Sequence, residues 1–135
     1  MSHPPPELRP RYRTFWGRVH SFRYAIQGVA FMLRTQHNAW IHAAISLVVV
    51  AAGLAFGVTD AEWCWLVLAM ASVWTAESFN TALEIIVDIA SPERLPAAGR
   101  AKDVGAAAVL LCSVGAAVIG LLVFLPYIVA RLHAA

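Results

Sequence analysis

The sequence predicts an all-α membrane protein in which an N-terminal amphipathic surface helix precedes three transmembrane helices. Hydrophobic residues make up 60% of the 135 residues, charged residues only 13%, and the mean hydropathy is +0.67. A soluble domain of this size buries too little surface to hide so many apolar side chains. The apolar residues also gather into three long runs, which is typical of helices that cross a bilayer.

Charge and cysteine usage exclude several functional classes. The formal net charge of +2 is too small to favour nucleic-acid binding. Cys64 and Cys112 lie far apart in apolar runs, so they are predicted to be packing residues rather than a disulfide or metal pair. The N-terminus has three consecutive prolines and no apolar segment, which argues against a secretory signal peptide.

The N-terminal part divides into a flexible segment and a helix. Residues 1–14 are rich in proline and arginine and are predicted to be flexible. The remaining residues, 15–135, are predicted to form one domain, which begins with a helix at about residues 15–36. Apolar residues recur there at steps of three and four, and the polar side carries Arg18 and Arg23. A basic amphipathic helix favours the membrane interface, and packing on a soluble core is the alternative.

The three transmembrane helices are expected at about residues 39–58, 63–90 and 103–130. At 1.5 Å per residue the first run is just long enough for a hydrocarbon core of about 30 Å. This run is apolar apart from a few residues, among which His42 is interpreted as an interfacial polar side chain.

Local signals predict where these helices begin and end. Thr59 followed three residues later by Glu62 is a capping-box pattern, so a new helix is expected to start there. That helix is predicted to end at Ser91, which precedes a proline. The polar segment 92–103 is expected to be a loop, and Pro126 is expected to kink or end the last helix.

The distribution of basic residues predicts the orientation. Six of the ten Lys and Arg residues precede the first span, none lies between the first two spans, and three lie between the last two. By the positive-inside rule, the N-terminus and the second loop face the cytoplasm and the C-terminus lies outside. We therefore expect a multi-pass protein of the bacterial inner (cytoplasmic) membrane, with both basic segments on the side that holds ATP.

A stripe of polar residues on the second span is the main functional signal. Glu77, Asn80, Glu84 and Asp88 follow spacings of three, four and four, which places them within about 80° of one helix face. Carboxylates at membrane depth are costly and usually functional. Such a stripe can bind Mg²⁺, which uses one or two carboxylates together with substrate phosphates. Glu77 is the deepest of the four and could accept a proton from a lipid hydroxyl.

The basic segment after the stripe complements it. Arg100 and Lys102 could clamp a polyphosphate. Phosphoryl transfer requires positioning and charge neutralisation more than covalent chemistry, so these groups form a minimal set for it. Because no P-loop or protein-kinase glycine motif is present, a nucleotide site would be unconventional.

Two other functions fit the same stripe. It could be the relay of a small oligomeric transporter or proton conductor, which would not need the basic loop. It could also join helices by hydrogen bonds in a purely structural membrane module.

Two motifs carry a family resemblance. They are ESFNTALEIIVD at residues 77–88 and GRAKDVGAAAVL at residues 99–110, separated by a short loop. Together they resemble the signature of the prokaryotic diacylglycerol kinase family, which includes undecaprenol kinases. The upstream segments FRYAIQG (22–28) and RTQHNAWIH (34–42) resemble its surface-helix region and favour the undecaprenol kinase branch. The resemblance covers about residues 15–128.

The resemblance implies an ATP-dependent lipid kinase with a surface helix and three spans. Such an enzyme transfers the γ-phosphoryl group of MgATP to the hydroxyl of a membrane lipid alcohol. The alcohol is diacylglycerol or undecaprenol, and the product is phosphatidic acid or undecaprenyl phosphate. The implied cofactor is Mg²⁺, ATP is the co-substrate, and no nucleic-acid partner is expected. The resemblance also implies a homotrimer whose active sites are shared between subunits.

The resemblance assigns roles residue by residue. Glu77 is similar to the catalytic base and, with Ala106, would meet the lipid. Glu84 and Gln36 match the metal-binding positions. The supporting residues would be Asn38, Asn80, Asp88 and Arg100. The residues expected to contact ATP are Arg18, Tyr24, Gln36, Glu84, Glu93, Arg94, Leu95, Lys102 and Asp103.

Gln36 departs from the family pattern, in which this position usually carries a second metal-binding glutamate. A glutamine offers a neutral carbonyl oxygen to Mg²⁺ but removes a negative charge. Metal affinity could therefore fall, or Asp88 and the phosphates could take its place. A catalytically impaired homologue is the alternative that follows from this substitution.

Overall fold

The structure is a computed structural model, and it describes residues 15–93 and 95–134. Over these residues it consists of α-helices joined by short turns, which confirms the all-α class. The segment 1–14, predicted to be flexible, lies outside the described residues. The helices in chain order are α1 (Phe15–Thr35), α2 (His37–Phe56), α3 (Asp60–Ala90) and α4 (Pro96–Ala134).

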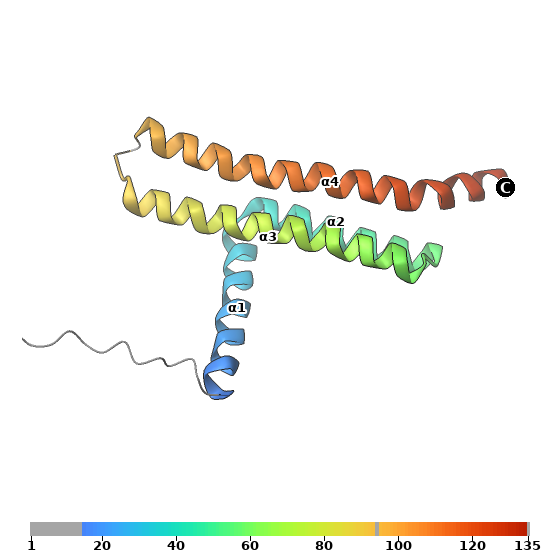
Figure 1. Ribbon diagram of the computed structural model, residues 1–135, viewed down its shortest axis with the longest axis horizontal. Helices are drawn as coiled ribbons and strands as arrows, with labels where there is room; N and C mark the ends of the chain where they lie inside the picture. Colours follow the sequence, from blue (N-terminus) through green and yellow to red (C-terminus); the bar gives the residue numbers. More distant parts are fainter. Residues whose placement is uncertain (1–14, 94, 135) are drawn as a thin grey trace, which may run out of the picture.

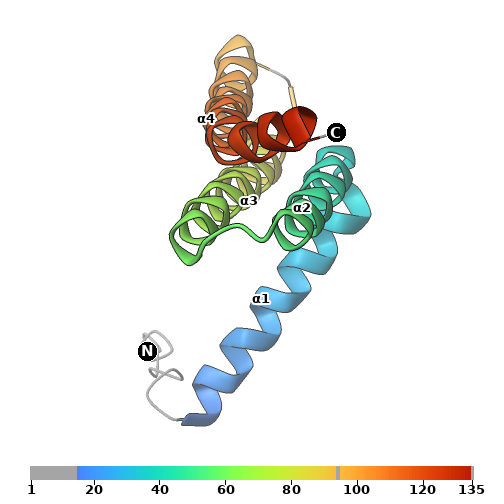
Figure 2. The same ribbon diagram turned by 90° about the vertical axis from the view of Figure 1, so that its right-hand side faces the viewer.

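Helices α2, α3 and α4 form a bundle, and α1 leaves this bundle at a steep angle. α3 and α4 run antiparallel along their whole length, and α2 lies beside α3 (Figure 1). Seen from the end of the bundle, α1 slants away from α2 and makes few contacts with the rest (Figure 2). The chain turns between α1 and α2 at Gln36, whose backbone is extended.

Two of the described helices are long and apolar enough to cross a membrane. They are α2 and α4, with mean hydropathies of 2.1 and 2.7 in their most apolar stretches. α3 is 31 residues long, but Glu77, Asn80 and Glu84 interrupt its apolar sequence and lower its hydropathy. Length and composition therefore support two of the three predicted spans.

The surface of the bundle is unusually apolar. Only eight hydrophobic residues are buried among those described, whereas large exposed apolar side chains occur along all four helices. Water would strongly disfavour an apolar surface of this extent. The bundle therefore requires an apolar surrounding, supplied by lipid or by other protein chains.

The turn between α2 and α3 forms as the sequence predicted. Gly57 ends α2 with a φ of 68°, a left-handed conformation that glycine adopts without steric cost. Thr59 then caps α3, and both reciprocal hydrogen bonds with Glu62 are present, which confirms the capping box.

α4 is longer than the sequence predicted. It begins at Pro96, so the segment 92–103, expected to be a loop, is helical from that residue onward. Proline suits the first helical turn because its ring fixes φ at a helical value. It lacks a backbone N–H, but an N–H at that position would have no acceptor within the helix. α4 also continues through Pro126 to Ala134, and its last turns lean toward α2 (Figure 2).

Contacts with the α2–α3 turn explain why α4 does not stop at its internal proline. The Tyr127 hydroxyl donates to Glu62 Oε2 at 2.7 Å, and Arg131 donates to the carbonyl of Ala55 at 3.0 Å. These bonds, made after the proline, hold the last turns in place. The Tyr127 hydroxyl and the capping bonds from Thr59 hold the pKa of Glu62 below its usual range.

Candidate active site

A polar cavity opens between α2, α3 and α4. Its volume is about 310 Å³. Asn38 and His42 line it from α2, and the facing wall of α4 is built from small and apolar residues and Ser113. The predicted site residues that the structure brings together around this cavity are Asn38, Asn80, Glu84 and Ala106.

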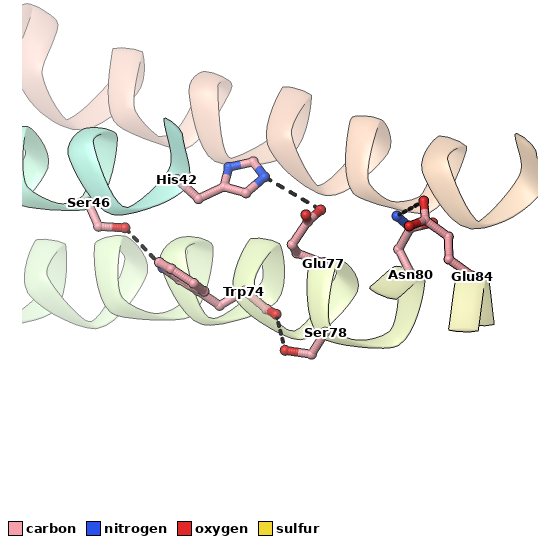
Figure 3. Close-up of polar contacts among 7 residues, drawn as sticks. All are labelled: His42, Ser46, Trp74, Glu77, Ser78, Asn80 and Glu84. Atoms are coloured by element: carbon pink, nitrogen blue, oxygen red, sulfur yellow. Dashed lines mark hydrogen bonds and ion pairs between the residues drawn. The ribbon is translucent and has the colours of Figure 1, made fainter. Parts of the chain in front are cut away.

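Asn80 and Glu84 form the polar wall on α3. Asn80 Nδ2 donates a hydrogen bond to Glu84 Oε1 at 3.1 Å (Figure 3). The other amide atom, Asn80 Oδ1, is fully buried and has no hydrogen-bond partner among the described residues. A buried carbonyl oxygen without a partner is rare in folded proteins, and this one packs closely against Gly105 of α4.

Gly105 allows α4 to approach this wall closely. A Cβ atom added at Gly105 would lie 2.6 Å from Asn80 Oδ1 and 2.8 Å from Leu83 Cδ2, distances that real side chains do not adopt. The glycine therefore determines how tightly α4 packs against the polar stripe.

Glu77 points into the bundle rather than toward lipid. It lies nearly one turn before Asn80 on α3, and its side chain is only 1% exposed. His42 on α2 faces it, with Nε2 and Oε2 3.9 Å apart (Figure 3). The burial of an acidic side chain in a chain this apolar is costly, which is the signature expected of a functional carboxylate.

The structure corrects the interpretation of His42. It is not the interfacial side chain that the sequence predicts, because its side chain is only 13% exposed and lies between the helices. Its ring meets Trp74 edge-on, with centroids 6.3 Å apart, and Trp74 Nε1 donates to Ser46 Oγ at 3.1 Å. The available signal was the spacing of His42 and Ser46, two polar residues one turn apart in an apolar run.

The far end of the stripe is joined to α4 by an ion pair. Lys102 Nζ donates to Asp88 Oδ1 across the α3–α4 turn. The side chains are 35% and 68% exposed, respectively. Exposed ion pairs of this kind contribute little stability, so Lys102 can exchange Asp88 for another anion.

Gln36 lies at the break between α1 and α2. It is half-buried and occupies the N-cap position of α2 without a side-chain capping bond. The structure does not place it in the wall of the polar cavity.

The other described residues that were predicted to contact ATP do not line the cavity. Tyr24 is exposed on α1. The Arg18 side chain and Arg94 lie outside the described part of the structure. The exposed residues near the α3–α4 turn that do not line the cavity are Glu93, Leu95, Arg100 and Asp103.

The oxygen atoms of the cavity fit a magnesium ion that also binds substrate. In the described residues, no group of three or more His, Cys, Asp or Glu side chains converges to hold a metal. The cavity is lined by the side chains of Glu84, Asn38 and Asn80, which carry carboxylate and amide oxygens. Mg²⁺ commonly uses one or two carboxylates and completes its shell with water and substrate phosphates.

Comparison with known proteins agrees with this geometry. The sequence profile of the prokaryotic diacylglycerol kinase family matches residues 23–124. The undecaprenol kinase of Bacillus subtilis is 36% identical over 106 residues, which cover 78% of this chain and 86% of that protein. The diacylglycerol kinase of Synechocystis sp. is 35% identical over 107 residues, covering 78% of this chain and 61% of that protein.

A third relative extends the comparison. The diacylglycerol kinase of Haemophilus influenzae is 29% identical over 108 residues, covering 78% of this chain and 92% of that protein. No solved structure matches the chain. The match of the family profile over most of the chain, together with these relatives, shows that the chain belongs to the prokaryotic diacylglycerol kinase family of membrane lipid kinases.

Proposed function

We propose that the protein transfers the γ-phosphoryl group of MgATP to the hydroxyl of a membrane lipid alcohol, either undecaprenol or diacylglycerol. The observation that carries this proposal is the buried Glu77 carboxylate, which lies 3.9 Å from Nε2 of His42, a residue in the wall of the cavity that Asn80 and Glu84 also line. In this proposal the site would combine a proton acceptor with oxygen ligands for Mg²⁺ between membrane helices. The names of the relatives support a lipid substrate of one of these two classes.

In the proposed reaction Glu77 accepts the proton of the lipid hydroxyl. The hydroxyl oxygen then forms a bond to the γ-phosphorus as the bond between the β- and γ-phosphoryl groups breaks, and ADP leaves. Glu84, with the amide side chains that line the cavity, would hold Mg²⁺, which would neutralise charge on the phosphates during transfer. Lys102 and Arg100 would pair with the phosphates.

We further propose that α3 spans the membrane together with α2 and α4, while α1 lies on the cytoplasmic surface of the inner membrane. α3 has 31 residues and α4 has 39, which correspond to about 46 Å and about 58 Å. Both exceed a hydrocarbon core of about 30 Å. The α3–α4 turn with Lys102 therefore extends into water on the side that holds ATP, and the C-terminus lies outside.

The test is to incubate the purified protein with radiolabelled ATP and each lipid in parallel, with Glu77→Gln as the matched variant. The variant keeps the size of the side chain but cannot accept the proton, so we expect turnover to fall about 100-fold or more. ATP binding should be unchanged. Turnover of Glu77→Gln at the parental rate would remove Glu77 from the role of base.

The same preparation separates the alternatives. A transporter or proton relay would produce ion flux in liposomes without ATP. An impaired homologue would bind ATP but phosphorylate neither lipid. A structural module would neither bind ATP nor phosphorylate a lipid.

A further inference from the structure

Two buried polar atoms face each other between α2 and α3. His42 Nε2 and Glu77 Oε2 are 3.9 Å apart, and neither has a hydrogen-bond partner among the described residues (Figure 3). Isolated buried polar atoms are strongly disfavoured, and a buried carboxylate most of all. A movement of about 1 Å by either side chain would bring the two atoms to hydrogen-bonding distance. Each of the two atoms could therefore satisfy the hydrogen-bonding capacity of the other.

The imidazole ring of His42 packs against Trp74. Trp74 contacts it edge-on, with 66° between the ring planes, and the Trp74 indole donates to Ser46 Oγ at 3.1 Å. Ser46 lies one turn after His42 on α2, and Trp74 lies nearly one turn before Glu77 on α3. The same two helices thus position both the pair and its support.

His42 also lies where two cavities adjoin. It lines the polar cavity and a neighbouring apolar cavity of about 210 Å³ between the same three helices. Ser113 on α4 is the other residue common to both walls. A lipid alcohol has a single hydroxyl on an apolar body, so a boundary of this kind suits its reacting end.

We propose that His42 is a positioning residue for Glu77, which deepens the proposed kinase function and rests on it. Nε2–H of His42 holds Glu77 Oε2 and thereby directs Oε1 toward the lipid hydroxyl. Oε1 takes the hydroxyl proton as the oxygen–phosphorus bond forms and ADP leaves. His42 itself exchanges no proton with the substrate.

Few charged groups surround this pair. α2 contributes His42 and α3 contributes Glu77 and Glu84. The α4 residues that line the two cavities carry no titratable side chain, and α1 lines neither cavity.

The first experiment compares His42→Gln and His42→Leu with the parent protein. Glutamine retains an N–H donor, so we expect turnover within about threefold of the parent but a displaced pH profile. Leucine removes the donor, so kcat should fall about 30-fold or more while KM for ATP stays within about twofold. His133→Gln, an exposed histidine at the end of α4, is the matched control and should change neither quantity.

A merely structural role makes a different prediction. Both variants would then lose activity in proportion to the loss of folded, assembled protein, and the pH profile of the remaining activity would match the parent. That result would overturn the proposal.

The second experiment needs no catalysis. The nitrogen resonances of His42 are recorded by NMR in the parent protein and in Glu77→Gln. A change in the Nε2 resonance is expected, and an unchanged resonance would overturn the pairing. If the parent phosphorylates neither lipid, the proposed function fails, while this measurement still decides whether His42 and Glu77 interact.

Discussion

Individual residues of the site differ in whether their polar atoms are satisfied. Glu84 accepts a hydrogen bond from Asn80, and Asp88 is paired with Lys102. In contrast, Asn80 Oδ1 and Glu77 Oε2 are buried and have no hydrogen-bond partner among the described residues. Unsatisfied buried atoms are costly in a folded protein, so each is expected to gain a partner in the functional protein, and the partner proposed for Glu77 Oε2 is His42.

Gln36 provides a prediction at this scale. Its side chain makes no capping bond at the start of α2, so it is free to reach a ligand. Gln36→Glu adds a negative charge at the position that the family resemblance matches to a metal-binding glutamate, and we expect a several-fold lower Mg²⁺ concentration at half-maximal activity. A titration of activity against Mg²⁺ measures this. An unchanged Mg²⁺ response would show that Gln36 does not contribute to metal binding.

The sequence was most informative where the signal is local. The spacing of Glu77, Asn80 and Glu84 predicted a shared helix face because helical periodicity depends only on neighbouring residues. The partner of Glu77 depends instead on how α2 packs against α3, which no spacing encodes. For this reason His42 was misinterpreted, although its residue type and position were in view.

The α3–α4 hairpin is the element that fixes the shape of the cavity. Gly105 lies at its closest approach, where an added Cβ would collide with Asn80 Oδ1. Proline and glycine also explain why the boundaries of α4 were predicted poorly. A segment with Pro96 and Gly99 resembles a loop in composition, whereas tertiary contacts beyond Pro126 keep the other end helical.

Gly105→Ala is expected to destabilise the hairpin by about 1–3 kcal/mol, because overpacking forces the two helices apart. Thermal unfolding in detergent measures the change. Gly115→Ala on the same helix is the control, since nothing lies within 4 Å of a Cβ there. That variant should be neutral or slightly stabilising, because alanine favours the helix over glycine. Equal effects of the two substitutions would contradict the close approach at Gly105.

The other end of the hairpin gives a pH-dependent prediction. The hydrogen bond from Tyr127 lowers the pKa of Glu62 in the folded protein. The associated stability is present above the ordinary pKa of glutamate and is lost as the pH falls through the lowered value. Tyr127→Phe should therefore reduce the melting temperature at neutral pH, and the difference from the parent should shrink in acid. A difference independent of pH would exclude the Glu62 bond as its cause.

Among the described residues, far more large apolar side chains are exposed than buried, and neither Tyr24 nor the exposed residues near the α3–α4 turn line the cavity in one chain. We propose that the functional unit is a homotrimer in which neighbouring chains complete each site. This arrangement would cover apolar helix faces and would bring ATP-binding residues from one chain to the cavity of another.

Mixing two inactive variants tests this arrangement. Glu77→Gln subunits lack the base, and Lys102→Ala subunits lack a phosphate contact. If sites are shared between chains, trimers assembled from both variants regain part of the activity, because some sites contain neither defect. Co-purified mixtures are compared with each variant alone at the same protein concentration. Absence of recovery in mixtures shown to be trimeric would mean that each chain holds a complete site.

The burial of Glu77 also affects the step after chemistry. In the proposed reaction its environment would accept an uncharged alcohol, whereas the product carries a phosphate whose negative charges a low-dielectric setting disfavours. Once Glu77 has released the proton it accepted, its restored carboxylate would also repel this phosphate. The headgroup would therefore move outward toward water, and the enclosed acid that starts the reaction would also promote the release of the product.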